Sequence, residues 1–190
     1  IRLARNIYGA ADELLRYICV DSEVQSTLLL GAPGAGKTTV LREIIRTLSN
    51  GEGLFRAYQV ALADERSELA GMYEGKSSLD VGARTDVMDS CPKAQAMRML
   101  IRSMAPEVLA ADELGTREDI RAVEEALTAG IAVIATMHGK SMEDLYNRPG
   151  LENIMAKHLF RTIIILSDNR CKGRAEQIYR WQNGTYERVK

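Results

Sequence analysis

Apolar residues fall into two alternating patterns along the chain. Short apolar runs, typical of buried strands, alternate with longer segments in which apolar residues recur every three or four positions, as on one face of a helix. The runs predict strands at 26–30, 57–63, 108–111, 131–135 and 161–166. The periodic segments predict helices at 3–18, 39–48, 94–104, 116–130 and 151–159. Strands that alternate with helices favour an α/β fold with a mostly parallel sheet, in which ligands bind at the carboxyl ends of the strands.

Two further segments depart from this alternation. Residues 66–91 are rich in Gly, Ser and Asp, and we interpret them as a long functional loop. Near the end of the chain, segments 175–181 and 185–189 flank Asn183-Gly184, which suits the type I′ turn of a β-hairpin. The sequence therefore predicts a C-terminal hairpin after the parallel part of the sheet.

The junction between the first strand and the next helix carries a phosphate-binding pattern. Residues 31–39 fit G-x-x-x-x-G-K-[ST], with an apolar run before them and an amphipathic helix after them. Glycines let the backbone wrap a triphosphate, so that several N–H groups and the helix N-terminus point at the same anion. Lys37 would reach the β- and γ-phosphates, and the Thr38 hydroxyl would ligate Mg²⁺. The predicted nucleotide-binding residues are Gly31, Ala32, Pro33, Gly34, Ala35, Gly36, Lys37, Thr38 and Thr39.

An acidic pair follows the apolar run at 108–111. Asp112 would hold Mg²⁺ through water, and Glu113 would polarise the attacking water as the catalytic base. The strand at 57–63 lies between the phosphate-loop helix and this pair, which marks the RecA-like (ASCE) branch of the P-loop NTPases. Because the sequence lacks the guanine-binding pattern N-K-x-D, ATP is favoured over GTP.

Polar residues at other strand ends are candidates for catalysis and coupling. Thr136 and His138 would sense the γ-phosphate, although a purely structural histidine stays an alternative. Asp64 and Glu65 would order the water or the metal shell. Arg84 would reach a neighbouring subunit's nucleotide as a finger, or else lie on a solvated surface. The predicted catalytic set is Lys37, Asp64, Glu65, Arg84, Glu113 and His138.

Composition and charge narrow the class of protein. A formal net charge of -1, with one Trp and two Phe, makes nucleic acid an unlikely partner. No apolar stretch is long enough to span a bilayer, and three distant cysteines without C-x-x-C spacing fit free thiols in a reducing cytoplasm. The chain begins with Ile rather than Met. We expect residues 1–25 to be a helix and linker that follow a further N-terminal domain, and residues 26–190 to form the RecA-like ATPase domain.

Motifs outside the phosphate loop resemble those of the stage III sporulation protein AA family. The matching segments are Val60-Ala61-Leu62-Ala63-Asp64-Glu65-Arg66-Ser67-Glu68-Leu69-Ala70-Gly71, Val81-Gly82-Ala83-Arg84-Thr85-Asp86-Val87, Cys91-Pro92-Lys93-Ala94, Ile101-Arg102-Ser103-Met104-Ala105-Pro106, Asp112-Glu113-Leu114-Gly115 and Ala135-Thr136-Met137-His138-Gly139. The resemblance implies an ATPase of endospore-forming bacteria, related to the hexameric traffic ATPases of type II and type IV secretion. It also implies self-assembly into a ring, with membrane-embedded channel proteins between mother cell and forespore as partners. The ATPase itself would be peripheral to the membrane, in the cytoplasm of the mother cell.

The chain departs from the wider secretion-ATPase pattern at two points. Those enzymes follow the catalytic Glu with Ile-Arg-Asp, whereas this chain has Leu114-Gly115-Thr116-Arg117. They also bring arginines from an N-terminal domain onto a neighbour's nucleotide, so hydrolysis by these residues alone would be weak. Two alternatives stay open: a RecA-like motor on single-stranded nucleic acid, which would need a basic and aromatic pore, and a regulatory ATP-binding module without turnover.

Overall fold

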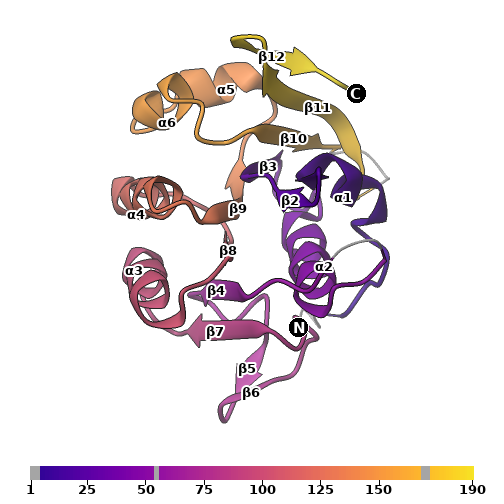
Figure 1. Ribbon diagram of the computed structural model, residues 1–190, viewed down its shortest axis with the longest axis vertical. Helices are drawn as coiled ribbons and strands as arrows, with labels where there is room; N and C mark the ends of the chain where they lie inside the picture. Colours follow the sequence, from indigo (N-terminus) through magenta and orange to yellow (C-terminus); the bar gives the residue numbers. More distant parts are fainter. Residues whose placement is uncertain (1–4, 54–55, 168–171) are drawn as a thin grey trace.

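An eight-stranded sheet runs through the centre of the molecule (Figure 1). The computed structural model describes residues 5–53, 56–167 and 172–190. The strands of this sheet are β3 (Thr27–Gly31), β4 (Val60–Asp64), β7 (Thr85–Asp89), β8 (Val108–Ala111), β9 (Ala132–His138), β10 (Thr162–Leu166), β11 (Ala175–Gln182) and β12 (Thr185–Arg188). Their order across the sheet is β12-β11-β10-β3-β9-β8-β4-β7.

The six strands from β10 to β7 are parallel, and β11 and β12 form an antiparallel hairpin at the other edge. The predicted α/β fold with a mostly parallel sheet and a C-terminal hairpin is therefore confirmed. Strand β9 separates β3, which enters the phosphate loop, from β8, which ends at Asp112. Because parallel strands share one carboxyl edge, the polar residues that follow β3, β4, β8 and β9 are brought together there.

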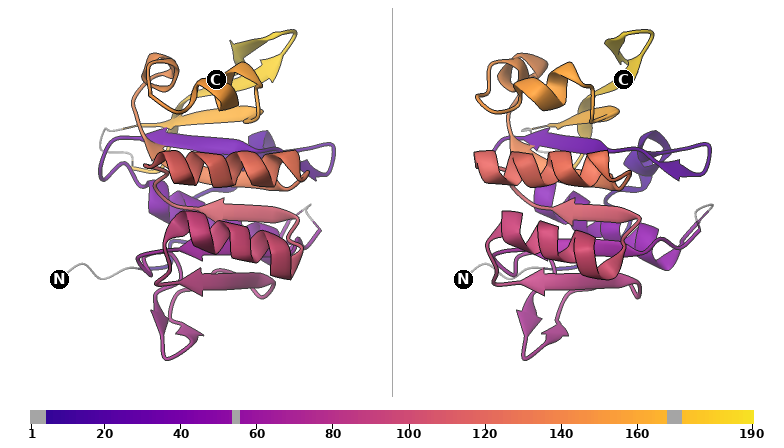
Figure 2. Two further views of the ribbon diagram at one scale, coloured as in Figure 1. Left: turned by 90° about the vertical axis from the view of Figure 1, so that its left-hand side faces the viewer. Right: turned by 60° about the vertical axis from the view of Figure 1, so that its left-hand side comes forward.

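Helices cover both faces of the sheet (Figures 1 and 2). One face packs against α1 (Asp12–Ile18) and α2 (Lys37–Asn50), and the other against α3 (Lys93–Met104), α4 (Arg117–Thr128), α5 (Met142–Tyr146) and α6 (Glu152–Ala156). Successive strand residues alternate between the two apolar clusters, so Leu29 packs on the α2 side while Leu28 and Leu30 pack on the α4 side. Burial on both faces explains why these strands are continuous apolar runs.

Local geometry explains where several elements begin or end, and it confirms the predicted start of the helix at 116 and the predicted turn at 183–184. Helix α2 ends at Gly51, which has φ 70° and is the left-handed residue that stops a helix. Helix α4 begins at Thr116, whose hydroxyl accepts from the Asp119 amide in a capping box. The hairpin turns at Asn183 (φ 54°) and Gly184 (φ 83°), as a type I′ turn requires.

Two of the element predictions are wrong. Of the helix predicted at 3–18, residues 3 and 4 lie outside the described residues, and the described part is helical only from Asp12. The segment before Asp12 contacts α2 instead, where the Gly9 amide donates to Glu43 at 2.7 Å. The loop predicted at 66–91 contains the small hairpin β5 (Met72–Tyr73) and β6 (Lys76–Ser77) and the edge strand β7. Strand β7 is half-buried along its whole length, so its sequence carries no apolar run.

Other elements differ less from the prediction. The helix predicted at 151–159 is the shorter α6, and α5 before it was not predicted. A short ribbon of β1 (Cys19–Val20) and β2 (Glu23–Val24) links α1 to the central sheet. Cys19 and Cys91 are free thiols, and burial raises the pKa of Cys19 to about 11; Cys171 lies outside the described residues. None of the helices in the described part of the chain is both long and apolar enough to cross a bilayer.

Candidate functional site

The loop that leaves β3 is shaped by glycines at its centre and at its end. Gly34 has φ 77° and Gly36 has φ 96°, conformations that disfavour any residue with a Cβ. A Cβ at Gly36 would also lie 2.9 Å from the Gly173 amide nitrogen, and that amide donates to the Ala35 carbonyl at 2.8 Å. The loop therefore turns tightly and delivers its N–H groups to the N-terminus of α2, an arrangement suited to an anion.

Lys37, the first residue of α2, is only 7% exposed and reaches across the mouth of this loop. Its Nζ donates to the carbonyl of Gly31 at 2.8 Å and to that of Ala32 at 3.1 Å, and lies 3.2 Å from His138 Nδ1. Burial lowers the pKa of Lys37, while the carboxylates of Asp112 and Glu113 oppose that shift. The ammonium group is thus surrounded by hydrogen-bond acceptors, and a phosphate can take the place of the carbonyl oxygens.

Thr38 and Asp112 meet across the sheet, although they are 74 positions apart. The Thr38 hydroxyl donates to the Asp112 carboxylate at 2.7 Å, and the buried Thr136 hydroxyl donates to the other carboxylate oxygen. A hydroxyl and a carboxylate oxygen are the hard donors that Mg²⁺ prefers. These two residues therefore fit the magnesium ion that accompanies a nucleoside triphosphate.

Glu113 is held by partners on several sides. Its carboxylate bonds to His138 Nε2 and lies 3.3 Å from Arg66 Nη1, and its amide donates to the Thr136 hydroxyl at 2.8 Å. Because the Lys37 ammonium can only donate, His138 Nδ1 accepts from it, and the proton of a neutral ring lies on Nε2, directed at Glu113. Partial burial raises the pKa of Glu113, but the hydrogen bond from His138 and the charges of Arg66 and Lys37 outweigh it, so the net shift is downward. Glu113 is therefore kept as a carboxylate, able to accept a proton.

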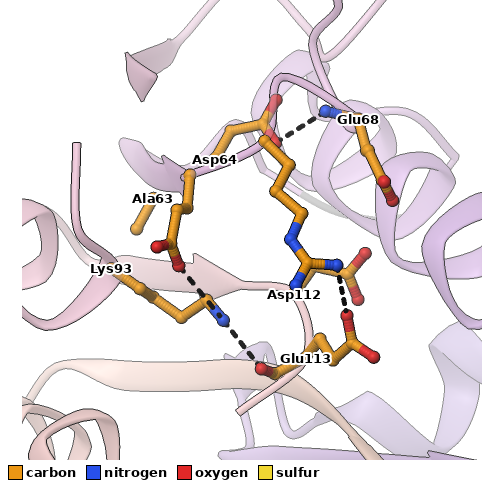
Figure 3. A pocket seen from close by; sticks show the side chains of 8 residues that line it. Ala63, Asp64, Glu68, Lys93, Asp112 and Glu113 are labelled. Carbon is orange, nitrogen blue, oxygen red and sulfur yellow. Dashed lines mark hydrogen bonds and ion pairs between the residues drawn. The ribbon is translucent and has the colours of Figure 1, made fainter. Parts of the chain in front are cut away.

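A second set of polar residues lines a pocket beside Glu113, at the ends of β4 and β8 (Figure 3). Here Asp64 is only 3% exposed, and its carboxylate accepts from the amides of Glu68, Leu69 and Ala70 at 3.0, 3.1 and 2.8 Å. The Lys93 ammonium lies 3.9 Å from Glu65 and donates to the Glu113 carbonyl at 2.7 Å. This set fixes the loop after β4 against the backbone of Glu113.

The structure brings most of the predicted site residues together, but not all of them. Lys37, Thr38, Asp112, Glu113 and His138 form one hydrogen-bonded group. Asp64 and Glu65 line the adjoining pocket.

Arg84 directly precedes β7 and so lies at the amino end of the parallel strands, opposite the carboxyl end where the phosphate loop lies. Its carbonyl accepts from the amide of Val60, the first residue of β4, whereas Asp64 ends that strand. At about 3.3 Å per residue the two ends of β4 are roughly 13 Å apart. Arg84 therefore does not approach the phosphate loop of its own chain.

Three residues of the site make contacts that the sequence did not predict. Thr136 was predicted to sense the γ-phosphate together with His138, but its side chain and backbone hold Asp112, Glu113 and Leu114 behind the acidic pair. Arg66 and Lys93 were noted only as parts of motifs. A lysine in the first turn of a helix opposes the helix dipole, and this was a signal that Lys93 serves a contact elsewhere.

Comparison with known proteins identifies the family. The family model described as "Sporulation stage III, protein AA" matches residues 1–186. The chain belongs to this family. It is similar to stage III sporulation protein AA of Bacillus subtilis (strain 168), with 42% identity over 94% of the chain. The chain spans 58% of the length of that relative.

Solved structures of a bacterial ATPase and a pilus retraction motor share the fold. The ATPase DotB of Legionella pneumophila superposes with a TM-score of 0.58 and 23% identity, over 81% of this chain and 43% of DotB. The pilus retraction motor PilT with bound ADP gives a TM-score of 0.54 and 18% identity, over 87% of this chain and 45% of PilT. The chain thus shares the central fold of these two ATPase structures.

Proposed function

We propose that this chain binds Mg-ATP and hydrolyses it as the motor domain of a sporulation-specific ring ATPase. The observation that supports this most directly is the meeting of three motifs from separate strands. Lys37 and Thr38 follow β3, Asp112 and Glu113 follow β8, and His138 ends β9, and hydrogen bonds join all of them at one edge of the sheet. A loop for phosphate, oxygen donors for magnesium and a carboxylate base are the parts that phosphoryl transfer to water requires.

Each group has a role in this proposal that follows from its position. Lys37 and the loop amides bind the β- and γ-phosphates, and Thr38 and Asp112 hold Mg²⁺, which supplies charge neutralisation when bound. Glu113 orients the attacking water and takes its proton, for which its ionised state is required. His138 lies between Lys37 and Glu113, so a γ-phosphate on Lys37 would alter the hydrogen bond that reaches Glu113. Asp64 and Glu65 would couple this change to the loop after β4.

The biological setting is also part of the proposal. The family relationship and the fold of secretion ATPases support a motor that assembles as a ring, of six subunits, on membrane-embedded channel proteins between mother cell and forespore. The ring would work in the cytoplasm of the mother cell, at the membrane surface. Nucleic acid is not expected as a partner, since the net charge of -1 offers no general attraction to phosphate backbones.

The first experiment is ATP turnover against protein concentration, beside Glu113→Gln. A shared-site ring predicts a specific activity that rises with concentration, and Glu113→Gln should bind ATP normally while slowing turnover by about a hundredfold or more. Glu124→Gln is the matched control, because Glu124 pairs with Lys157 on the surface of α4. Tight Mg-ATP binding without any turnover in the wild type would instead support a regulatory ATP-binding module.

Mixed subunits test whether sites are shared between neighbours. Since Arg84 is exposed and remote from its own phosphate loop, it can act only on another subunit's nucleotide. Arg84→Ala should then lower turnover with unchanged ATP binding, and mixing it with Glu113→Gln subunits should restore part of the activity. Absence of any recovery in the mixture would remove Arg84 from the catalytic set.

A further inference from the structure

Lys93 occupies an unusual place for a lysine. It is the first residue of α3, where its charge opposes the positive end of the helix dipole. Its side chain is only 10% exposed, although lysine ammonium groups are strongly hydrated and rarely buried. Such a position must be stabilised by specific contacts, and these involve the segment that carries Glu113.

The contacts of Lys93 are made to two acidic residues in different ways. Its Nζ donates to the main-chain carbonyl of Glu113 at 2.7 Å (Figure 3). The same Nζ lies 3.9 Å from the carboxylate of Glu65. Glu65, at the end of β4, thus supplies a counter-charge, while the strong hydrogen bond goes to the backbone of Glu113. A cation on a carbonyl oxygen is a charge-assisted bond, stronger than a neutral one.

The backbone of Glu113 needs such support. Its φ is 55°, in the left-handed region that disfavours residues with a Cβ. Strand β9 holds the two peptide groups that flank the Cα of Glu113: the Glu113 amide donates to the Thr136 hydroxyl at 2.8 Å, and the Leu114 amide donates to the Thr136 carbonyl at 2.8 Å. Because the Leu114 amide and the Glu113 carbonyl belong to one peptide group, Lys93 and β9 fix that group from its two ends.

We propose that Lys93 is a positioning residue that holds the Glu113 backbone in the conformation from which its carboxylate faces the attacking water. This rests on the proposed ATPase function, in which Glu113 is the base. Lys93 itself does not contact nucleotide in this account, because its ammonium is directed at Glu113 from the pocket on the β4 side. Its loss should affect the chemical step and leave nucleotide binding intact.

The turnover test compares Lys93→Met, Lys93→Arg and the control Lys157→Met in the full chain. Lys93→Met should lower kcat by about tenfold or more, since a small misplacement of a catalytic group has effects of that order, while KM and the Kd for Mg-ATP stay unchanged. Lys93→Arg should recover much of the loss. In a Glu113→Gln background, Lys93→Met should cause no further loss, because Lys93 acts through Glu113. Lys157→Met removes a lysine that also pairs with a glutamate, but on the surface, and should change nothing.

A second measurement tests the positioning without relying on turnover. Hydrogen exchange of the amides of Glu113 and Leu114 should become faster in Lys93→Met and return toward the wild-type rate in Lys93→Arg. If Lys93→Met does not fold, Lys93→Gln, which keeps a shorter neutral donor, should show the same losses. Unchanged exchange, weakened ATP binding, or a loss that adds to that of Glu113→Gln would overturn the inference. A wild-type chain without turnover would refute the proposed ATPase function, while the exchange rates would still decide on Lys93.

Discussion

Two Asp-Glu pairs lie at the same edge of the sheet and look alike in the sequence. Asp64-Glu65 ends β4 and Asp112-Glu113 follows β8, and these strands are neighbours in the sheet. Each pair lies at the carboxyl end of a buried apolar strand. The hydrogen-bond donors around the two aspartates nevertheless differ.

The difference lies in which elements supply the hydrogen-bond donors. Asp112 accepts from hydroxyls on α2 and β9, elements that also carry the phosphate loop and His138. Within the part of the chain that the structure describes, the Asp64 carboxylate accepts from amides of the loop that follows it, at positions 68–70. A carboxylate that accepts from hydroxyls of other elements is available to a metal ion. A carboxylate whose oxygens already accept amides of its own loop stabilises that loop instead. The comparison teaches that position at a strand end predicts proximity to the site, but the donors decide the role.

Removing the cation of the phosphate loop should have the largest effect on the Asp112 side. Lys37→Ala should abolish binding of Mg-ATP, because no other cation in the described residues of the loop reaches Gly31 and Ala32. Isothermal titration calorimetry measures the binding of Mg-ATP, and Lys157→Ala is the control variant on the surface. Micromolar binding by Lys37→Ala would contradict the assignment of the loop.

The comparison itself is tested by making the same change at both aspartates. Asp112→Asn should weaken Mg-dependent ATP binding by roughly tenfold or more, as loss of a metal-shell carboxylate does, with little change in stability. Asp64→Asn should instead lower the free energy of unfolding by about 1–3 kcal/mol, because a charged acceptor of three amides is replaced by a neutral amide group. Titrations with ATP with and without Mg²⁺, and urea unfolding of both variants, separate the two outcomes.

The reverse pattern would show that the roles are exchanged. If Asp64→Asn loses Mg-dependent binding and keeps its stability, the acidic group on β4 belongs to the metal shell after all. If both variants lose both properties, the two pairs act as one unit, and the distinction between their donors does not hold.

The parts of the site that could be predicted from the sequence are those carried by contiguous residues. The phosphate loop, the strand before it and α2 follow one another, so their spacing alone indicates their geometry. Asp112 and Glu113 needed one further assumption, that strands of a parallel sheet end at a common edge. The fold prediction succeeded for the same reason, because buried strands and amphipathic helices are local patterns.

The parts that could not be predicted depend on contacts between distant segments. Arg66 meets Glu113 over 47 positions and Lys93 meets it over 20, and both contacts depend on how the segment between β4 and α3 folds. Strand β7 was missed within that segment because an edge strand with half-buried residues lacks an apolar run. Arg84 belongs to the same segment, and its position at the amino end of the parallel strands depends on the pairing of β7 with β4, which the sequence around Arg84 does not indicate.

The smallest expected effect concerns Arg66, whose charge reaches across from the β4 side to Glu113. Its cationic group helps to hold the pKa of Glu113 below the ordinary value, so removing that charge makes the carboxylate harder to ionise and the pKa rises. In Arg66→Ala the acid limb of the kcat/KM profile should therefore move to higher pH, whereas Arg66→Lys should leave it in place. Because the Arg66 side chain is 70% exposed, added salt should screen the contact and shrink the difference between the two variants. A limb that moves to lower pH, or a difference that grows with salt, would show that Arg66 acts on turnover by some means other than the charge of Glu113.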